Sequence, residues 1–231
     1  MTPLTVREVG LGAQGTEGGR AAAAGAGWAW LRTRRGPVHL TSARGPRTPL
    51  TAVVERVPVL EPGDRVRLDA RQARVWRAPA PPPPAPRGRI AAACAVVWPH
   101  LWNDPRALAL AADPLEHVLP DLAGRGPGLT PAGDDALLGL LLARRATGHP
   151  RARRDAALVL AWARRRSGMP SLALLRWAAH GEGPEPAVLA LAALLAGDAA
   201  ALAPAVRRLL AFGRTTGPAI LTGLVGGLAA A

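Results

Sequence analysis

The sequence contains no lysine and no tyrosine, and it has one cysteine and one phenylalanine among 231 residues. The single cysteine, Cys94, excludes an intramolecular disulfide, and its place in the apolar run IAAACAVVW predicts a small buried side chain. The five histidines are dispersed along the chain, so they lack the spacing typical of a metal site. We therefore expect no metal and no cofactor.

Long apolar runs are also missing. No stretch reaches the roughly 18 consecutive apolar residues of a membrane span. The two most apolar stretches, residues 187–203 and 218–231, are both interrupted by glycine and are typical of buried helices. The first residues lack the apolar segment of a secretory signal peptide. These absences predict a cytoplasmic protein with no membrane partner.

Acidic residues are outnumbered: all 29 basic residues are arginine, against 16 acidic residues, and the net charge is +13. A nucleic-acid surface needs basic residues that converge on one face, with aromatic stacking partners between them. The arginines are instead spread along the chain, and the clusters at 151–154 and 164–166 fall at predicted helix ends or exposed faces. We therefore expect a solvated basic surface and no nucleic-acid partner.

The first third of the chain divides by composition. Residues 1–35 are rich in glycine and alanine without a clear period, which predicts a loose leader, with at most one strand near Trp28 and Trp30. Residues 36–77 show alternation and β-branched residues between turn signals, as in PVHLTSA and PLTAVVERV. This pattern predicts a small β module of short strands.

The rest of the chain changes character after a proline run. Residues 78–88, APAPPPPAPRG, predict a stiff linker. Residues 89–231 predict a mostly α-helical domain, so the fold class is α+β. Helical spacing of leucine and alanine predicts helices over residues 106–112, 131–146, 151–166, 171–180, 186–195, 202–212 and 218–230.

One stretch of the helical domain is rich in special residues: GRGPGLTPAGDDALLG, residues 124–139. Thr130 before a proline predicts a helix start, with the threonine as cap and the proline at the first helical position. The glycines before it, among them Gly126 and Gly128, allow positive φ angles and close approach by a ligand. A glycine-rich loop that leads into a helix N-terminus favours anion binding. The stretch lacks the lysine of a phosphate-binding P-loop.

Two adjacent carboxylates, Asp134 and Asp135, follow this loop. Their side chains diverge by about 100° on a helix whose leucines face the core, so at least one carboxylate is expected to be partly buried. A buried carboxylate needs a partner, which can be an arginine, backbone amides, a metal or a substrate amide. Gly133, costly in a helical turn, indicates close approach to the backbone. Stabilisation of the helix end alone is the alternative.

A second stretch, FGRTTGPAILTGLVGG at residues 212–227, repeats the same pattern of glycine, threonine and proline before a small-residue helix. Two such helix starts predict one shared polar pocket. Tight helix packing is the alternative explanation of the glycines.

The two stretches, with SLALLRWAAHGEGPEPAVLALAALLAGD between them, resemble the family of the AllH subunit of bacterial oxamate carbamoyltransferase. That family has Gly-Pro-Gly-Leu-Thr-Pro-Ser-Gly-Asp-Asp at the first motif. The chain departs from the family at Ala132 and Thr216, where serine is usual, and at Arg214, where histidine is common. The resemblance implies that Asp134 and Asp135 are catalytic residues. The substrate-binding residues that it implies, at matching or substituted positions, are Gly126, Gly128, Thr130, Gly133, Ser171, Gly213, Arg214, Thr215, Thr216 and Gly217.

The resemblance implies transfer of a carbamoyl group between carbamoyl phosphate and oxamate during allantoin breakdown. It also implies a small-molecule substrate and other protein subunits, one of them similar to an acyl-CoA synthetase. From the residues themselves we expect helix-terminal amides to hold an anion and an aspartate to orient an amide nitrogen or accept its proton. Arg125 or Arg214 is expected to pair with a carboxylate or phosphate. A non-catalytic binding or scaffold subunit is the alternative function.

Overall fold

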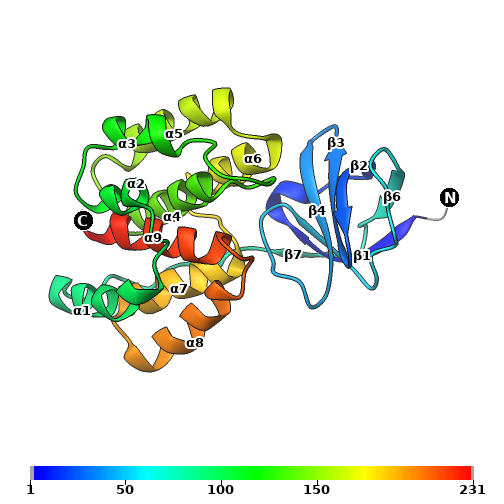
Figure 1. Cartoon of the computed structure of the whole chain (residues 1–231). Coiled ribbons are helices and arrows are strands. Elements are labelled where there is room, and N and C mark those ends of the chain that lie inside the picture. Colours follow the sequence, from blue (N-terminus) through cyan, green and yellow to red (C-terminus); the bar gives the residue numbers. More distant parts are fainter. Residues whose placement is uncertain (1–2, 230–231) are drawn as a thin grey trace. The chain divides into compact units, whose positions relative to one another are not determined.

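The computed structural model describes residues 3–229, and the chain divides into two compact units, Met1–Ala78 and Pro79–Ala231 (Figure 1). The first unit contains strands and the second contains helices. The predicted α+β class, a small β module followed by a mostly helical domain, is confirmed.

The first unit is a sheet with the strand order β5-β4-β3-β2-β6-β1-β7, in which β5 also pairs with β1. This additional pairing closes β1 to β6 into a barrel, which leaves no open edge between them. The core holds apolar side chains of the strands, among them Leu31, Leu40 and Val66. The strands are β1 (Leu4–Gly10), β2 (Gly18–Gly25), β3 (Trp28–Thr33), β4 (Gly36–Ser42), β5 (Thr51–Val54), β6 (Arg65–Asp69) and β7 (Arg74–Trp76).

The expectation of a loose leader with at most one strand over residues 1–35 is wrong, because β1, β2 and β3 all lie there. Strand β2, GGRAAAAG, has weak intrinsic β propensity but pairs with β3 on one side and β6 on the other. Its small residues are needed at this position: a Cβ at Gly18 would lie 2.2 Å from the Val66 carbonyl oxygen. Tertiary pairing therefore decides the structure of a segment whose composition indicates a loop.

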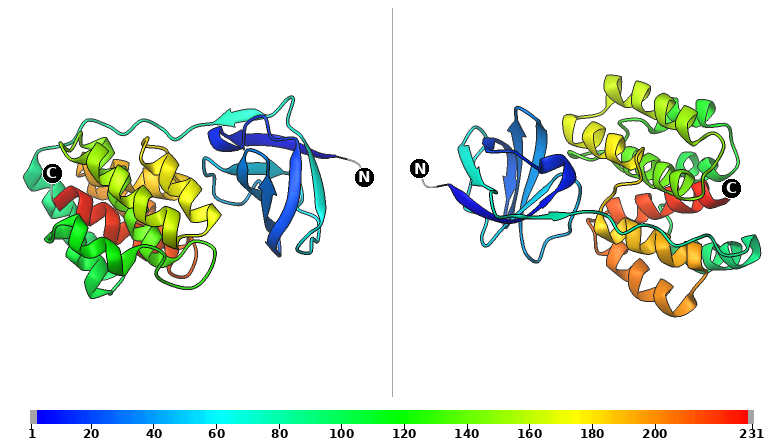
Figure 2. Two further views of the ribbon diagram at one scale, coloured as in Figure 1. Left: turned by 90° about the horizontal axis from the view of Figure 1, so that it is seen from above. Right: turned by 180° about the vertical axis from the view of Figure 1, so that it is seen from behind.

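The second unit has α4 and α9 at its centre, with α3, α5 and α6 on one side and α1, α7 and α8 on the other (Figures 1 and 2). The helices are α1 (Arg87–Val97), α2 (Pro105–Leu108), α3 (Leu115–Leu122), α4 (Ala132–Ala146), α5 (Ala152–Arg166), α6 (Met169–Ala178), α7 (Glu185–Ala196), α8 (Ala199–Leu210) and α9 (Thr216–Ala229). No helix within residues 3–229 is both long and apolar enough to cross a membrane.

Helices α4 and α9 pack with their backbones in contact. A Cβ at Gly223 of α9 would lie 1.8 Å from the Ala136 carbonyl oxygen, and one at Gly139 of α4 would lie 2.2 Å from the Ile220 carbonyl oxygen. Real Cβ atoms do not approach this closely, so glycine is required on both helices. This packing holds the N-terminal ends of α4 and α9, where the two glycine-rich stretches lie, in a fixed relation.

Candidate functional site

The loop between α3 and α4 depends on glycine for its conformation. Gly124, Gly126 and Gly128 have φ angles of 72°, 114° and 94°, which L side chains rarely adopt. The loop folds back over the helix start, where the Gly133 N–H donates to the Arg125 carbonyl oxygen at 2.9 Å. Gly133 is also needed for packing, since its Cβ would lie 2.0 Å from the Leu122 carbonyl oxygen.

The prediction that Thr130 caps helix α4 is wrong. The N-cap residue is Pro131, whose ψ of 144° is extended rather than helical, and no side chain caps the helix. Thr130 therefore stands one residue before the cap, outside the position from which its hydroxyl reaches the free amides. The Gly133 amide has the Arg125 carbonyl as its partner instead.

Asp134 is buried at 2% exposure and joins three segments of the helical unit. Its Oδ1 accepts hydrogen bonds from the Gly124 N–H at 2.7 Å and from the Ser167 hydroxyl at 2.9 Å. Within the described residues, its Oδ2 is buried without a hydrogen-bond partner. One oxygen thus fixes the loop before α4 and the residue after α5, while the other has unused accepting capacity.

Asp135 is equally buried, at 3% exposure, and its carboxyl is hydrogen-bonded with the Thr216 side chain at the start of α9. The pKa of Asp135 is raised from 3.8 to about 8, chiefly by burial. The Thr216 hydrogen bond lowers this pKa and the nearby Asp134 charge raises it, and both effects are included in that value. At pH 7 the Asp135 carboxyl is therefore largely protonated. Its Oδ2 has no hydrogen-bond partner in the described part of the chain.

The second glycine-rich turn presents a mixture of exposed and buried residues. Gly213 has a φ of 70°, and Gly213, Arg214 and Thr215 are exposed, while Thr216 is half-buried. Gly217 is required for packing, because its Cβ would lie 2.0 Å from the Leu209 carbonyl oxygen. The structure thus brings Asp135 and Thr216 together, whereas the glycines at 133 and 217 are explained by backbone packing.

Ser171 lies in the first turn of α6, a helix that packs against α4. Its side chain is buried at 2% exposure, and its hydroxyl has no hydrogen-bond partner among residues 3–229. The Oδ2 atoms of Asp134 and Asp135, in the same unit, are also buried without a hydrogen-bond partner among the described residues. Unpartnered buried polar atoms are rare in proteins, so these three oxygens mark the region around the start of α4 as unusual.

Several contacts around the site could not be predicted from the sequence. Ser167 follows a run of arginines at the end of α5, where nothing indicates contact with Asp134. Arg144 and Asp155 form a buried ion pair between α4 and α5 and line a cavity of about 390 Å³. Helical spacing shows that an arginine follows the leucines of α4, but only the helix packing shows its partner.

The described residues contain no group of three or more histidine, cysteine, aspartate or glutamate side chains that could hold a metal ion.

Comparison with known proteins gives one finding. The family described as oxamate carbamoyltransferase subunit AllH matches residues 122–228, a range that contains both glycine-rich stretches. No curated protein and no solved structure matches the chain. Residues 122–228 therefore resemble the AllH family, and the resemblance that the glycine-rich motif predicts is confirmed.

Proposed function

We propose that the chain is a subunit of a carbamoyltransferase that moves a carbamoyl group between carbamoyl phosphate and a small carboxylate of the oxamate type. The observation that carries the proposal is an overlap: the residues that match the family contain both buried aspartates and both glycine-rich turns. The geometry supports one polar centre at the paired helix starts, where the Asp135 carboxyl contacts Thr216.

The start of α4 supplies donors for an anionic or oxyanion group. In the described structure the N–H groups of Ala132 and Asp134 have no hydrogen-bond partner. Unpaired amides at a helix N-terminus point along the helix axis and add to the positive end of the helix dipole. They are therefore suited to the developing negative charge of a carbonyl under attack.

The two aspartates take different roles because their surroundings differ. In the proposed reaction the substrate nitrogen attacks the carbamoyl carbon, the new C–N bond forms, and the bond to the phosphate oxygen breaks. The nitrogen must lose a proton and the phosphate must leave. Asp135, largely protonated at pH 7, donates toward the leaving oxygen, and the unpartnered Oδ2 of Asp134 accepts from the nitrogen.

An arginine is the expected partner of the substrate's carboxylate or phosphate. Arg125 forms an ion pair with Asp104 at 3.5 Å, so its charge is partly compensated. Arg214 is exposed on the second turn and forms no ion pair with any described residue. We assign the substrate anion to Arg214, and we place the remaining substrate contacts at Gly126, Gly128, Thr130, Ser171, Gly213 and Thr215, with Gly133, Thr216 and Gly217 shaping the site.

The family description also supports assembly, since it names a subunit. We propose that the chain works in the cytoplasm with other protein subunits, one of them similar to an acyl-CoA synthetase, in the breakdown of allantoin.

A binding or scaffold subunit without catalysis is the second candidate. It is favoured by the glycines of the two stretches, because Gly133, Gly217 and Gly223 are each required by a close backbone contact. It is also favoured by Asp134, whose Oδ1 is occupied by two internal hydrogen bonds. On this account the carboxyl groups organise the helices and the reaction occurs on a partner.

The test is carbamoyl transfer by the assembled complex with the Asp135→Asn variant, using Asp113→Asn, an exposed aspartate of the same unit, as the matched control. Asparagine keeps the size of the side chain but cannot transfer a proton. We expect a fall in kcat of at least ~100-fold, the usual contribution of a general acid, with assembly of the complex unchanged. Activity per folded molecule equal to that of the control would contradict catalysis and favour the scaffold.

A further inference from the structure

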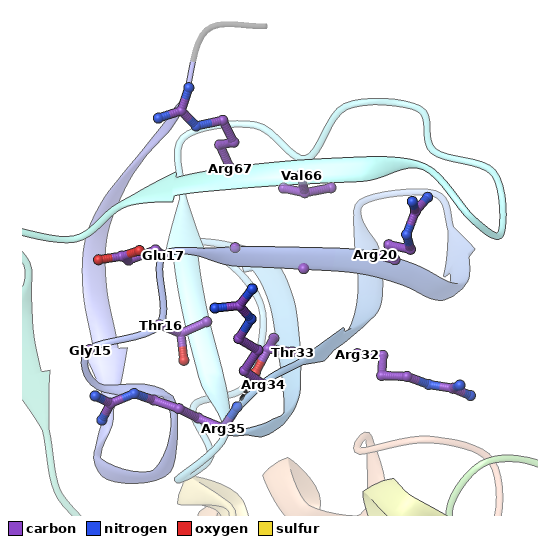
Figure 3. Close-up of a pocket in the computed structure, with 12 residues that line it drawn as sticks. Gly15, Thr16, Glu17, Arg20, Arg32, Thr33, Arg34, Arg35, Val66 and Arg67 are labelled. Carbon is purple, nitrogen blue, oxygen red and sulfur yellow. Dashed lines mark hydrogen bonds between the residues drawn. The ribbon is translucent and has the colours of Figure 1, made fainter.

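A cavity of about 730 Å³ in the β module lies among β2, β3, β6 and the turns beside them (Figure 3). Its lining is dominated by one type of charge. Five arginines line it, with Glu17 as the one acidic residue: Arg20, Arg32, Arg34, Arg35 and Arg67. In Figure 3 the Glu17 carboxylate points away from Arg20 and Arg34.

Strand register forces some of these charges together. Arg20 of β2 lies directly opposite Arg32 of β3 and, on its other side, opposite Arg65 of β6. Like charges directly opposite each other in a sheet are destabilising. Three neighbouring strands thus place arginine in one row, an arrangement that a bound anion would stabilise.

Several acidic side chains of the module are engaged with arginines away from this cavity. Three of them, Glu55, Glu8 and Asp69, pair with arginines outside the cavity: Arg7, Arg47 and Arg71. Within residues 3–229 the five arginines of the cavity form no ion pair. The hydrogen bond that Arg20 donates goes to the neutral Gly63 carbonyl.

A buried hydroxyl adds an independent observation. Thr16 lines the cavity and is 5% exposed, and its Oγ1 has no hydrogen-bond partner in the described structure. A buried hydroxyl without a partner costs free energy, which a ligand atom within reach would recover.

The turn between β3 and β4, which carries Arg34 and Arg35, is ordered by two hydrogen bonds of the Thr33 hydroxyl. The Thr33 hydroxyl donates to the Gly36 carbonyl oxygen at 2.7 Å and accepts from the Arg35 N–H at 3.1 Å. Figure 3 shows the Arg34 side chain between Thr16 and Thr33. These hydrogen bonds order the backbone of the turn, so less of it has to be ordered when an anion binds.

We propose that this cavity binds an oligophosphate anion, either free or as the phosphate chain of a nucleotide. Guanidinium groups bind phosphate oxygens with paired hydrogen bonds, and several phosphates are needed to neutralise five arginines. No aromatic side chain lines the cavity, so we expect the site to recognise the charge of the phosphates and not a nucleotide base. It lies outside the residues that match the AllH family and does not rest on the proposed carbamoyl transfer.

The missing aromatic platform also argues against a single-stranded nucleic acid, whose bases need stacking partners. The neighbouring Trp30 ring is 9% exposed and stacks on His39 at a centroid distance of 4.9 Å, so it is already engaged within the module.

Isothermal titration of the full chain with sodium tripolyphosphate tests the site. We expect saturable binding at one site that weakens as salt is added. In Arg20→Gln/Arg34→Gln the affinity should fall at least ~10-fold. Arg56→Gln, an exposed arginine of the same unit outside the cavity, should bind like the unaltered protein.

Thr16→Val is a second variant that removes only the unpartnered hydroxyl. We expect no loss of melting temperature and a weakening of tripolyphosphate binding of about tenfold. ATP that binds more tightly than tripolyphosphate would identify a nucleotide as the source of the phosphate chain, and equal affinity would identify a free oligophosphate.

Three results would overturn the proposal. One is the absence of saturable binding by tripolyphosphate. Another is an equal loss of tripolyphosphate affinity in Arg56→Gln and in the double variant, which would show only nonspecific electrostatic attraction to a basic protein. The third is tighter binding of a single-stranded RNA oligomer than of tripolyphosphate through the same arginines, which would assign a nucleic acid instead.

Discussion

The two units use the same residue types in opposite ways. In the β module charged side chains surround an open cavity without ion-pair partners, as the arginines at 20 and 34 show. In the helical unit charged side chains are buried and hydrogen-bonded, as for Asp134 and for the Arg144–Asp155 pair. Exposed charge is available to a ligand at little cost in stability, whereas buried charge determines both stability and chemistry.

The largest effect that we expect is physical separation of the two units. Residues 77–86, between β7 and α1, have no regular secondary structure, and most of them are proline or alanine. We propose that this segment is a linker that proteases reach first. Limited trypsin digestion should cut after Arg77 or Arg87 and release a stable helical piece, identified by mass spectrometry. A single protected core that includes this segment would contradict the boundary.

Gly223→Ala should cause the largest loss of stability by a single substitution, because the new Cβ would meet the Ala136 carbonyl oxygen at 1.8 Å. We expect a loss of about 3 kcal/mol in the free energy of unfolding, the upper part of the usual range for overpacking. Urea denaturation gives the value. Gly88→Ala is the control: nothing lies within 4 Å of its Cβ, so this helical position should gain stability.

Asp134→Ala should cost less, about 2 kcal/mol, because it leaves the Gly124 N–H and the Ser167 hydroxyl without their acceptor. Ser167→Ala removes one of the two hydrogen bonds and should cost about 1 kcal/mol. The same denaturation measurement compares the two variants. Equal stability of Asp134→Ala and the unaltered protein would show that this carboxylate does not join the three segments.

Arg32→Thr in the β module should have the smallest effect and the opposite sign. It removes one of two arginines that lie opposite Arg20, so we expect a gain of about 0.2–1 kcal/mol at low salt. The control is Arg74→Thr, whose register partner is Glu8, and this variant should not gain stability. A loss of stability in Arg32→Thr would show that other groups of the protein already offset the repulsion within the arginine row, without a bound anion.

Sequence patterns predict most of the helical unit. The seven helices expected from leucine and alanine spacing are all present, and six of them have ends displaced by three residues or fewer. The exception is the helix expected over 106–112, because α2 ends at Leu108 and a 3-10 turn, Ala109–Ala111, follows it. Helices α1 and α3 were not delimited, because α1 is apolar on every side and α3 contains Pro120. The α1 pattern lacks the period that marks an amphipathic helix. The α3 pattern has that period, since Leu115, Val118, Leu119 and Leu122 are its buried residues, so α3 could have been predicted in spite of its internal proline.

The β module was harder to predict for a physical reason. Strand β2 is built from glycine and alanine, and its state is set by β3 and β6, which are distant in sequence. The cavity arginines were missed for the same reason: Arg20, Arg34 and Arg67 line one cavity only after the barrel closes. Burial of the aspartates was predictable from helix geometry, whereas their partners Ser167 and Thr216 required the packing of α5 and α9 against α4.

The pH dependence of stability tests the protonated Asp135 most directly. A carboxyl whose pKa rises from 3.8 to about 8 on folding stabilises the folded state fully at low pH, and this contribution is lost as pH rises through about 8. Asp135→Asn cannot ionise, while the other carboxylates affect both proteins alike. The unfolding free energy of both proteins should be measured by urea denaturation from pH 4 to pH 9.

We expect the stability of Asp135→Asn relative to the unaltered protein to rise with pH across this window and to level off above about pH 8. The cause is that, between these two pKa values, Asp135 ionises in the unfolded chain of the unaltered protein but stays protonated in its folded state, which favours unfolding as pH rises. A difference that stays constant from pH 4 to pH 9 would show that Asp135 is charged in the folded protein and would contradict its role as the proton donor.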